Sequence, residues 1–471
     1  MPATRSCSRR PSRLCNEVRP CPGGAMTSLE ELTDALVDFA TAPPNLPVPP
    51  FYRLVLMNWL GCALAGAATS AVDRAVAVHA ADAGGTWLPP IGRRERLGLS
   101  ATVLIDCLSS AVLAYDDIHF ETTLHPTGPV AAAIFGLARS RAISGARALE
   151  ALRLGMEVEC RFSRLMMGPD TGSAPGWYPT GIAGGLGAAA ATAWLLGFGR
   201  DRMRHALGLA ATRAAGMRGT HGGMSAFYVP AVSAEAGYVA ARLAEAGFTS
   251  GPGALSGPMG LLRQIAPTPA VSAAGAGLGQ VFQSEATACK PYPYGFISFA
   301  LIDCCTALSP RVTGPDDIAK VEAEVSTAAA RLGNNPDPRS MFEAQISLRF
   351  IAALVLTAPA AAHRPLREDF HVGPAEAALM PRIEIRAATD LADHQARVVL
   401  TTRSGERIAA HCDTAPGSAA RLPGASALQA KFLDLATPVV GATVAGQCLQ
   451  DLMAVGECDD VATLLDRIAP A

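Results

Sequence analysis

Charged and aromatic residues are scarce in this chain. Only 17% of its 471 residues are charged and 6% are aromatic, while 50% are hydrophobic. The 39 Lys and Arg residues nearly balance the 41 Asp and Glu residues, and no basic run after residue 25 is dense enough to follow a phosphate backbone. This composition excludes a mostly disordered chain and argues against a nucleic-acid partner. It predicts a large buried core, arranged as two domains or as one large interrupted domain.

Patterns typical of a membrane span or a secretory signal are also missing. The longest uncharged stretch, Gly181–Gly199, is rich in Gly and Ala in its first half and is interrupted by Thr192, which favours a buried core helix over a bilayer span. Residues 1–25 carry five Arg residues, but no apolar segment follows them. We interpret them as a disordered or mis-assigned extension, with Met26 as the better start, and we expect no membrane association.

The 12 cysteines form no CxxC pair and no regular framework. Cys62, Cys107, Cys160 and Cys304 all lie in apolar surroundings. Small, buried, reduced thiols are typical of proteins in a reducing compartment, so the pattern predicts a cytoplasmic protein.

Helical patterns occupy the first part of the chain and return at its end. Ser28 and Glu31 form a capping-box pattern before apolar residues at helical spacing. Residues 50–265 are rich in Ala and Leu, with almost no period-2 alternation. After Pro423 the helical spacing returns. We therefore expect a helical domain made of residues 26–285 and 416–471.

Alternating apolar and polar residues distinguish the segment between these two parts. The alternation appears in Ile318–Val325, Arg382–Arg386 and Arg397–Thr402, and Ser404-Gly405 offers a hairpin turn. Helices are expected near 296–308 and 340–357. We therefore expect residues 286–415 to form a smaller α/β domain, inserted as a lid into a mostly α fold.

One candidate site is the break between two apolar helices that contains Asp116, Asp117, His119 and His125. Two acids and two histidines at such a break can supply a general base with its charge partner, metal ligands, or helix caps. The histidines are six residues apart and no third one is near, so we expect no metal.

Three further segments combine reactive side chains with Gly or Pro. Gly176–Gly181 contains Tyr178, and Gly219–Pro230 contains His221. Their glycines permit close approach of the backbone, either to a ligand or to another helix. The segment Cys289–Gly295 fixes Lys290 at the junction of the two predicted domains, where it is well placed to meet an anion or to act as an acid.

These four segments in this order, followed by Ala344–Phe350, resemble the MmgE/PrpD family, which includes 2-methylcitrate dehydratase and cis-aconitate decarboxylase. The resemblance runs from about residue 29 to the C-terminus. It implies a large all-helical domain formed by both chain ends, a smaller inserted α/β lid and a homodimer. It also implies a cofactor-independent and metal-independent lyase for di- or tricarboxylates, which removes a proton next to a carboxylate and then expels water or carbon dioxide.

Two motifs match the family closely, and several positions depart from it. His125-Pro126-Thr127 is similar to the family's His-Pro-Ser, and Lys290-Pro-Tyr-Pro is similar to its lysine motif. Ala114 stands where the family carries an Asp, Ala226 where it carries a Lys, and Phe350 where it carries a Tyr. The family carries a His at each of the three other positions, which are here Tyr178, Val229 and Gly295. Three of these changes replace a potential cation with a small side chain. Because each carboxylate needs charge-assisted donors, they predict a larger and less anionic substrate, still a carboxylic acid.

The resemblance and the residue chemistry together suggest a role for each side chain. His125 is expected to act as general base or acid, with Asp117 or Asp116 biasing its protonation, and Lys290 to stabilise a carboxylate or enolate. Tyr178 is expected to donate a proton, because a tyrosine is a poor base. The side chains expected to bind the substrate are Asp116, His119, Arg218, His221 and Tyr292.

Two other functions stay open at this point. An isomerase or epimerase uses the same proton abstraction, followed by reprotonation on the other face, and His125 with Tyr178 would suffice for it. A non-catalytic scaffold that binds only a ligand or a partner is the third possibility, supported by the replaced positions and opposed by the retention of His125 and Lys290.

Overall fold

The computed structural model describes residues 26–81, 89–167, 171, 176–418 and 420–469. The expected extension 1–25 lies outside these residues. Within them the fold is mostly α, as predicted. The first helix, α1 (Leu29–Thr41), begins at Ser28, whose side chain accepts from the Glu31 backbone while the Glu31 side chain reaches back, so the predicted capping box is present.

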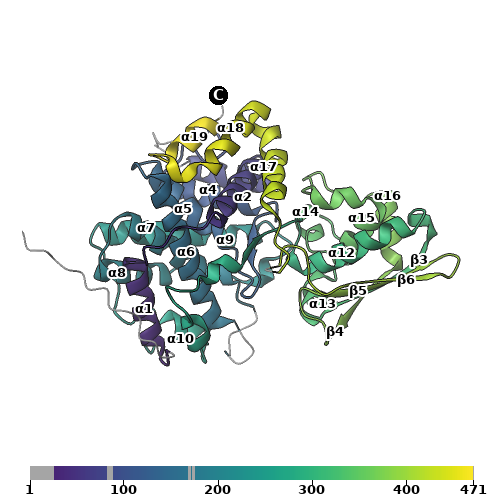
Figure 1. Cartoon of the computed structure of the whole chain (residues 1–471), viewed down its shortest axis with the longest axis horizontal. Helices are drawn as coiled ribbons and strands as arrows, with labels where there is room; N and C mark the ends of the chain where they lie inside the picture. Colours follow the sequence, from purple (N-terminus) through teal and green to yellow (C-terminus); the bar gives the residue numbers. More distant parts are fainter. Residues whose placement is uncertain (1–25, 82–88, 168–170, 172–175, 419, 470–471) are drawn as a thin grey trace, which may run out of the picture.

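The helices up to residue 275 form one large body (Figure 1). They are α2 (Phe51–Gly66), α3 (Ser70–Ala81), α4 (Leu99–Ala111), α5 (Thr127–Ala138), α6 (Gly145–Met166), α7 (Pro179–Leu195), α8 (Arg200–Ala211), α9 (Ser225–Glu245), α10 (Leu261–Ile265) and α11 (Val271–Gly275). The Gly- and Ala-rich α7 is buried and packs against α6 and α9. A Cβ atom on Gly237 of α9 would lie 2.3 Å from the carbonyl of Gly185 in α7, so glycine allows the two backbones to approach this closely.

In the described part of the chain, no single helix is both long and apolar enough to cross a bilayer. Among the described residues, the helices Phe51–Gly66 and Ser70–Ala80 reach that length and apolar composition only when they are taken together, and a bend divides them.

The segment that alternates in sequence forms a four-stranded sheet of order β4-β3-β5-β6. Its strands are β3 (Ile318–Ser326), β4 (Ile383–Ala388), β5 (Ala396–Thr402) and β6 (Arg407–Cys412). Strands β3 and β5 lie within one residue of the predicted positions, and β4 ends two residues beyond the predicted end. The pair β3–β4 is parallel, and the other two pairs are antiparallel. Helices α12 (Phe299–Leu308) and α15 (Leu348–Thr357) pack on the sheet, together with the shorter α13 (Thr327–Gly333), α14 (Met341–Ala344) and α16 (Pro374–Leu379) around it. Figure 1 shows this α/β part beside the main helical body.

The C-terminal helices lie on the helical body, next to helices from the beginning of the chain (Figure 1). They are α17 (Ala425–Val440), α18 (Ala442–Met453) and α19 (Ala462–Ile468). Phe432 of α17 and Leu452 of α18 share a buried core with Trp59 of α2. Burial of these apolar side chains against α2 therefore holds the two ends of the chain together.

Candidate active site

A short antiparallel ribbon joins the two most reactive segments of the sequence. Strand β1 (Asp117–His119) pairs with β2 (Thr287–Cys289), so that Asp117 lies opposite Cys289. The backbone N–H of Lys290 donates to the carbonyl of Asp116 over 3.0 Å, which extends the ladder by one bond. The ribbon thereby places Asp116 beside Lys290, although 174 positions separate them.

Asp116 is the centre of a cluster of charges. Its Oδ1 accepts from Lys290 Nζ over 2.6 Å, and its Oδ2 lies 2.8 Å from His125 Nδ1. Burial alone would raise the pKa of Asp116, but His125 and Lys290 together hold it well below its usual range. Asp116 is therefore ionised at physiological pH and contacts both Lys290 and His125.

Asp117 occupies a different environment, because successive residues of a strand point to opposite faces. Its Oδ2 accepts a hydrogen bond from Thr127, the residue that replaces Ser in the His-Pro-Ser motif. Burial, reinforced by the charge of Asp116, raises the pKa of Asp117 to about 7. The structure therefore gives the contact with His125 to Asp116 and not to Asp117.

His125 has one ring nitrogen available for proton transfer. Its Nδ1 faces the Asp116 carboxylate in an ion-pair contact that is not aligned as a regular hydrogen bond. A proton on Nδ1 is favoured there, which leaves the lone pair on Nε2. The backbone N–H of His125 donates to Thr180 Oγ1 over 3.0 Å, at the start of α7, and so fixes the backbone from which the ring projects.

Tyr178 lies between the two histidines of the site. Its ring centroid is 6.0 Å from that of His125 and 5.2 Å from that of His221. Burial raises the pKa of Tyr178, with a further contribution from Asp116. The phenol therefore stays protonated at neutral pH and is suited to donate a proton.

Arg218 and His221 belong to the turn that follows α8. Arg218 Nε donates to the carbonyl of Trp177 over 3.0 Å, and its Nη2 donates to Thr123 Oγ1 over 2.6 Å. His221 Nδ1 lies 2.7 Å from the carbonyl of Arg218. Because a carbonyl only accepts, Nδ1 carries the proton, and since burial lowers the pKa of His221, its Nε2 is an acceptor at neutral pH.

Backbone strain is concentrated at this site. Ala114 (φ 52°) and Thr123 (φ 54°) are the non-glycine residues of the described chain that have positive φ. Both line the cavity described next. The carbonyl of Ala114 accepts a hydrogen bond from Lys290 Nζ over 3.4 Å, and Thr123 Oγ1 accepts one from Arg218 Nη2. Each of the two strained residues is therefore bonded to a cationic side chain. Strain retained at a site in this way is typical of functional positions.

A cavity of about 720 Å³, open space at its mouth included, lies between the helical body and the α/β part and is lined by residues of both. Its polar lining includes His125, Tyr178, Arg218, His221 and Lys290. The other lining residues are Ala114, Thr123, Gly222, Ala226, Phe227, Gly295, Phe296, Ile297, Leu332, Phe342, Gln345 and Ile346. Four of the six departures from the family pattern therefore lie on this surface, namely Ala114, Tyr178, Ala226 and Gly295.

The other two departures and three of the predicted binding residues, Asp116, His119 and Tyr292, are not among the residues that line the cavity. Val229 is near Gly181 and Gly216, and Phe350 packs against Phe370 in the core of the α/β part. Tyr292 is buried against His363, with ring centroids 4.9 Å apart, and does not line the cavity.

His119 also lies away from the cavity lining, in contrast to the role expected from sequence. Its Nε2 contacts the carbonyl of Gln283 over 3.1 Å, and its Nδ1 contacts Thr122 Oγ1 over 2.8 Å. Burial lowers the pKa of His119 to about 4, so the ring is neutral and both nitrogens have partners. We interpret it as a link between β1 and the turn that precedes β2.

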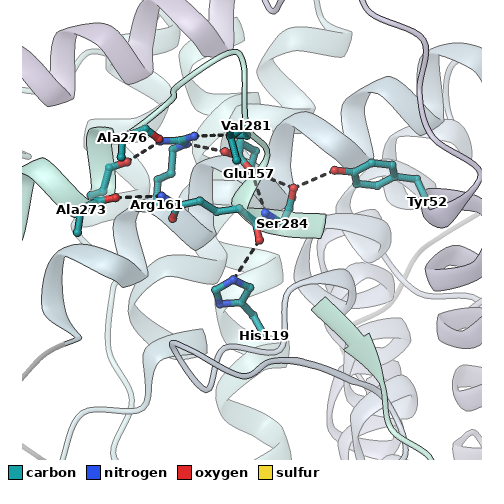
Figure 2. A network of polar contacts seen from close by, with 10 residues as sticks. Tyr52, His119, Glu157, Arg161, Ala273, Ala276, Val281 and Ser284 are labelled. Atoms are coloured by element: carbon teal, nitrogen blue, oxygen red, sulfur yellow. Dashed lines mark hydrogen bonds and ion pairs between the residues drawn. The ribbon is translucent and has the colours of Figure 1, made fainter. Parts of the chain in front are cut away.

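A buried polar network continues from His119 and anchors the segment that leads to β2 (Figure 2). Arg161 of α6 pairs with Glu157 over 2.5 Å and donates to the carbonyls of Ala274, Ala276 and Val281. Glu157 in turn accepts from the backbone and the hydroxyl of Ser284, each over 2.9 Å. The Arg161–Glu157 pair therefore holds the chain just before Lys290.

Lys431 lies next to the site and was not predicted from the sequence. It is buried on α17, and its Nζ donates to the carbonyls of Tyr115 and Lys290 over 2.6 and 2.9 Å. Nζ also lies 3.6 Å from the ring centroid of Tyr115. Its only sequence signal is a lysine on the apolar face of a helix. Lys431 ties the C-terminal helices to the two segments that carry Asp116 and Lys290.

Within the described ranges, no group of three or more His, Cys, Asp or Glu side chains is arranged to hold a metal ion.

Comparisons with known proteins identify the family of this chain. The family model for the MmgE/PrpD N-terminal domain matches residues 32–274, and the model for the MmgE/PrpD C-terminal domain matches residues 292–452. Similar curated proteins include a cis-aconitate decarboxylase of Aspergillus terreus, 28% identical over 214 residues, and the cis-aconitate decarboxylase-like protein oryM of Aspergillus oryzae, 29% identical over 217 residues. These matches cover 43% and 44% of this chain, and 42% and 45% of the relatives' own length. The chain belongs to the MmgE/PrpD family.

Proposed function

We propose that this protein is a lyase of the dehydratase or decarboxylase type. It would remove a proton next to a carboxylate or carbonyl and then expel water or carbon dioxide. The observation that carries the proposal is the contact of one ionised carboxylate, Asp116, with both His125 and Lys290 at the wall of the cavity. Membership of a family whose similar members include cis-aconitate decarboxylases supports it.

Three polar side chains of the cavity, His125, Lys290 and Tyr178, each have a step that they can perform. His125 Nε2 takes the proton, and Asp116 stabilises the imidazolium that results. Lys290 uses a donor that Asp116 leaves free to stabilise the enolate or its carboxylate. Tyr178 then donates a proton to the leaving group or to the product, since its phenol stays protonated.

The replaced positions at the cavity support a substrate that is larger and less anionic than 2-methylcitrate. Ala226 and Gly295 stand where the family carries a lysine and a histidine, and both line the cavity. A lost cation removes a charge-assisted donor for a carboxylate, and a smaller side chain leaves room for a larger substrate.

An isomerase or epimerase is the second candidate, and one observation favours it. The cavity presents His125, Tyr178 and His221 together, which provides more than one proton-transfer group without any need for a leaving group. Solvent deuterium that enters the substrate without elimination would identify this activity.

Proton NMR in deuterium oxide tests the proposed function. The protein and its His125→Ala variant are incubated with citrate, 2-methylcitrate, cis-aconitate, itaconate and bulkier substituted succinates. The expected result is label uptake or product formation that falls by about 100- to 10,000-fold in the variant. The exposed His411 provides a control, because His411→Ala leaves the cavity intact. Equal rates with and without His125 would reject the assignment.

The proposal extends to the assembly and its setting. We infer a cytoplasmic homodimer in which the α/β part closes as a lid over a small carboxylic acid. The contacts between the α/β part and the cavity support the lid, because Phe296, Ile297 and Ile346 line it. Light scattering would measure the dimer, and a monomer across the working concentration range would contradict it.

A further inference from the structure

The cavity has one polar side and one apolar side. The helical body contributes the polar groups, from the segments around His125, Tyr178 and Arg218. The α/β part contributes a mostly apolar wall made of Phe296, Ile297, Leu332, Phe342 and Ile346, with the neutral amide of Gln345 beside them. A ligand that fills this space must therefore be polar at one end and apolar over most of the remainder.

A balance of the charges around the cavity leaves one cation without an ion-pair partner among the described residues. Lys290 is offset by Asp116, which also holds His125, and a neutral His125 is the form that a base requires. Burial lowers the pKa of His221, so this ring is neutral at physiological pH. Asp117 lies behind the surface, bonded to Thr127, and does not line the cavity. Arg218 remains.

Arg218 is held in place by neutral groups only. Trp177 and Thr123 accept from its Nε and Nη2, and none of the ion pairs among the described residues includes it. Asp393 acts on it through space but is itself bonded to Ser326. Within the same residues no bond to its Nη1 is present, so this edge of the fixed guanidinium can meet a carboxylate.

We propose that the cavity binds a monocarboxylate with an apolar body, whose carboxylate contacts Arg218 and whose carbon chain lies on the wall formed by Ile297, Leu332 and Ile346. This inference rests on the proposed function in that it assigns the substrate class of the same cavity. Lys290 also lines the cavity, but its charge is already paired with Asp116, so a second or third carboxylate would find no unpaired cation and would lose its hydration against the apolar wall. The substrate is therefore a monoanion rather than a di- or tricarboxylate.

Calorimetry with unreactive probes tests the proposal without turnover. Butanoate, hexanoate and octanoate measure how affinity depends on the length of the carbon chain that contacts the apolar wall. Octanedioate and propane-1,2,3-tricarboxylate test the effect of additional carboxylates, and octanamide tests the loss of the single carboxylate charge. Each added methylene is expected to tighten binding roughly 4-fold, the transfer value for one buried methylene. Octanedioate is expected to bind at least 10-fold more weakly than octanoate. Ile346→Thr is expected to flatten the increase with chain length.

Arg218→Met is expected to weaken octanoate binding roughly 10- to 100-fold, the range for a hydrogen bond to a charged group, while octanamide binding is unchanged. The unchanged octanamide shows that the variant retains its cavity, and Arg218→Lys should recover part of the affinity. Arg213→Met is the matched control, since Arg213 is exposed, pairs with Glu235 and does not line the cavity.

Three results would overturn the inference: no probe binds, the di- or tricarboxylate binds as tightly as octanoate, or Arg218→Met leaves octanoate binding unchanged. The proton-exchange experiment separates this failure from that of the proposed function. Exchange on a tricarboxylate would support the lyase and reject the monocarboxylate. Arg218-dependent binding of octanoate, without exchange on any substrate, would do the reverse.

Discussion

The buried carboxyl of Asp117 makes the stability of this protein depend on pH. Burial and the charge of Asp116 raise its pKa from 3.8 to about 7. Between these values the folded state holds a proton that the unfolded state has lost, so the stabilisation is complete below about pH 4 and disappears as the pH rises through 7. The difference is about 3 pKa units at about 1.4 kcal/mol each, or about 4 kcal/mol in all.

Replacing Asp117 with Asn removes this dependence, because an amide stays neutral at every pH and still fits beside Thr127. The free energy of unfolding of Asp117→Asn is expected to exceed that of the native protein by up to about 4 kcal/mol at pH 8, and to approach it near pH 4.5. Urea unfolding followed by circular dichroism between pH 4.5 and 8.5 measures the difference.

The exposed Asp459 supplies the control, since Asp459→Asn should shift stability by less than about 0.5 kcal/mol at any of these pH values. A stability difference between Asp117→Asn and the native protein that stays constant from pH 4.5 to 8.5 would refute the reasoning. It would mean that Asp117 is ionised in the folded state throughout this range.

Three further predictions concern the stability of the folded protein. Lys431→Met leaves two buried carbonyls without a donor and should destabilise the protein by about 2 to 3 kcal/mol in urea unfolding, because loss of the buried charge offsets part of the penalty. Arg161→Met leaves the buried Glu157 unpaired and should destabilise by about 3 to 5 kcal/mol, part of which Glu157→Gln in the same chain restores. Ala114→Gly should not destabilise and should gain up to about 1 kcal/mol, since glycine adopts a φ of 52° without strain.

Each of these has an outcome that would contradict it. Unchanged stability of Lys431→Met would show that water reaches both carbonyls. A double variant of Arg161 and Glu157 that is less stable than Arg161→Met alone would show that the pair is not the source of the loss. A loss of about 1 kcal/mol in Ala114→Gly, the usual effect of glycine in a regular element, would show that the backbone at Ala114 is unstrained.

Most of the secondary structure could be predicted from the sequence because its signals lie within a few neighbouring residues. The capping box at Ser28 needs only three residues, and the strands at 318–326 and 396–402 show their buried face as simple alternation. The hairpin turn at Gly405, with φ 90°, is also set by its own residue. The ribbon of β1 and β2 was missed because three residues are too few to show a period.

The sequence by itself determined the mostly α fold, the α/β segment and the reactive residues from which the site is drawn. His125, Tyr178, Arg218, His221 and Lys290 were all selected from their motifs, and the structure places all of them on one cavity. Reactive side chains beside Gly and Pro are visible without coordinates, because the backbone conformations that these residues permit are encoded locally.

Only the tertiary structure decided which of these groups work together. It assigned His125 to Asp116 and not to Asp117, turned His119 away from the cavity, and brought Lys431 to the carbonyl of Lys290. It also supplied the apolar wall opposite Arg218. These partners lie tens to hundreds of positions apart, or on opposite faces of one strand, so the packing of helices and strands sets their pairing, and no local pattern records it.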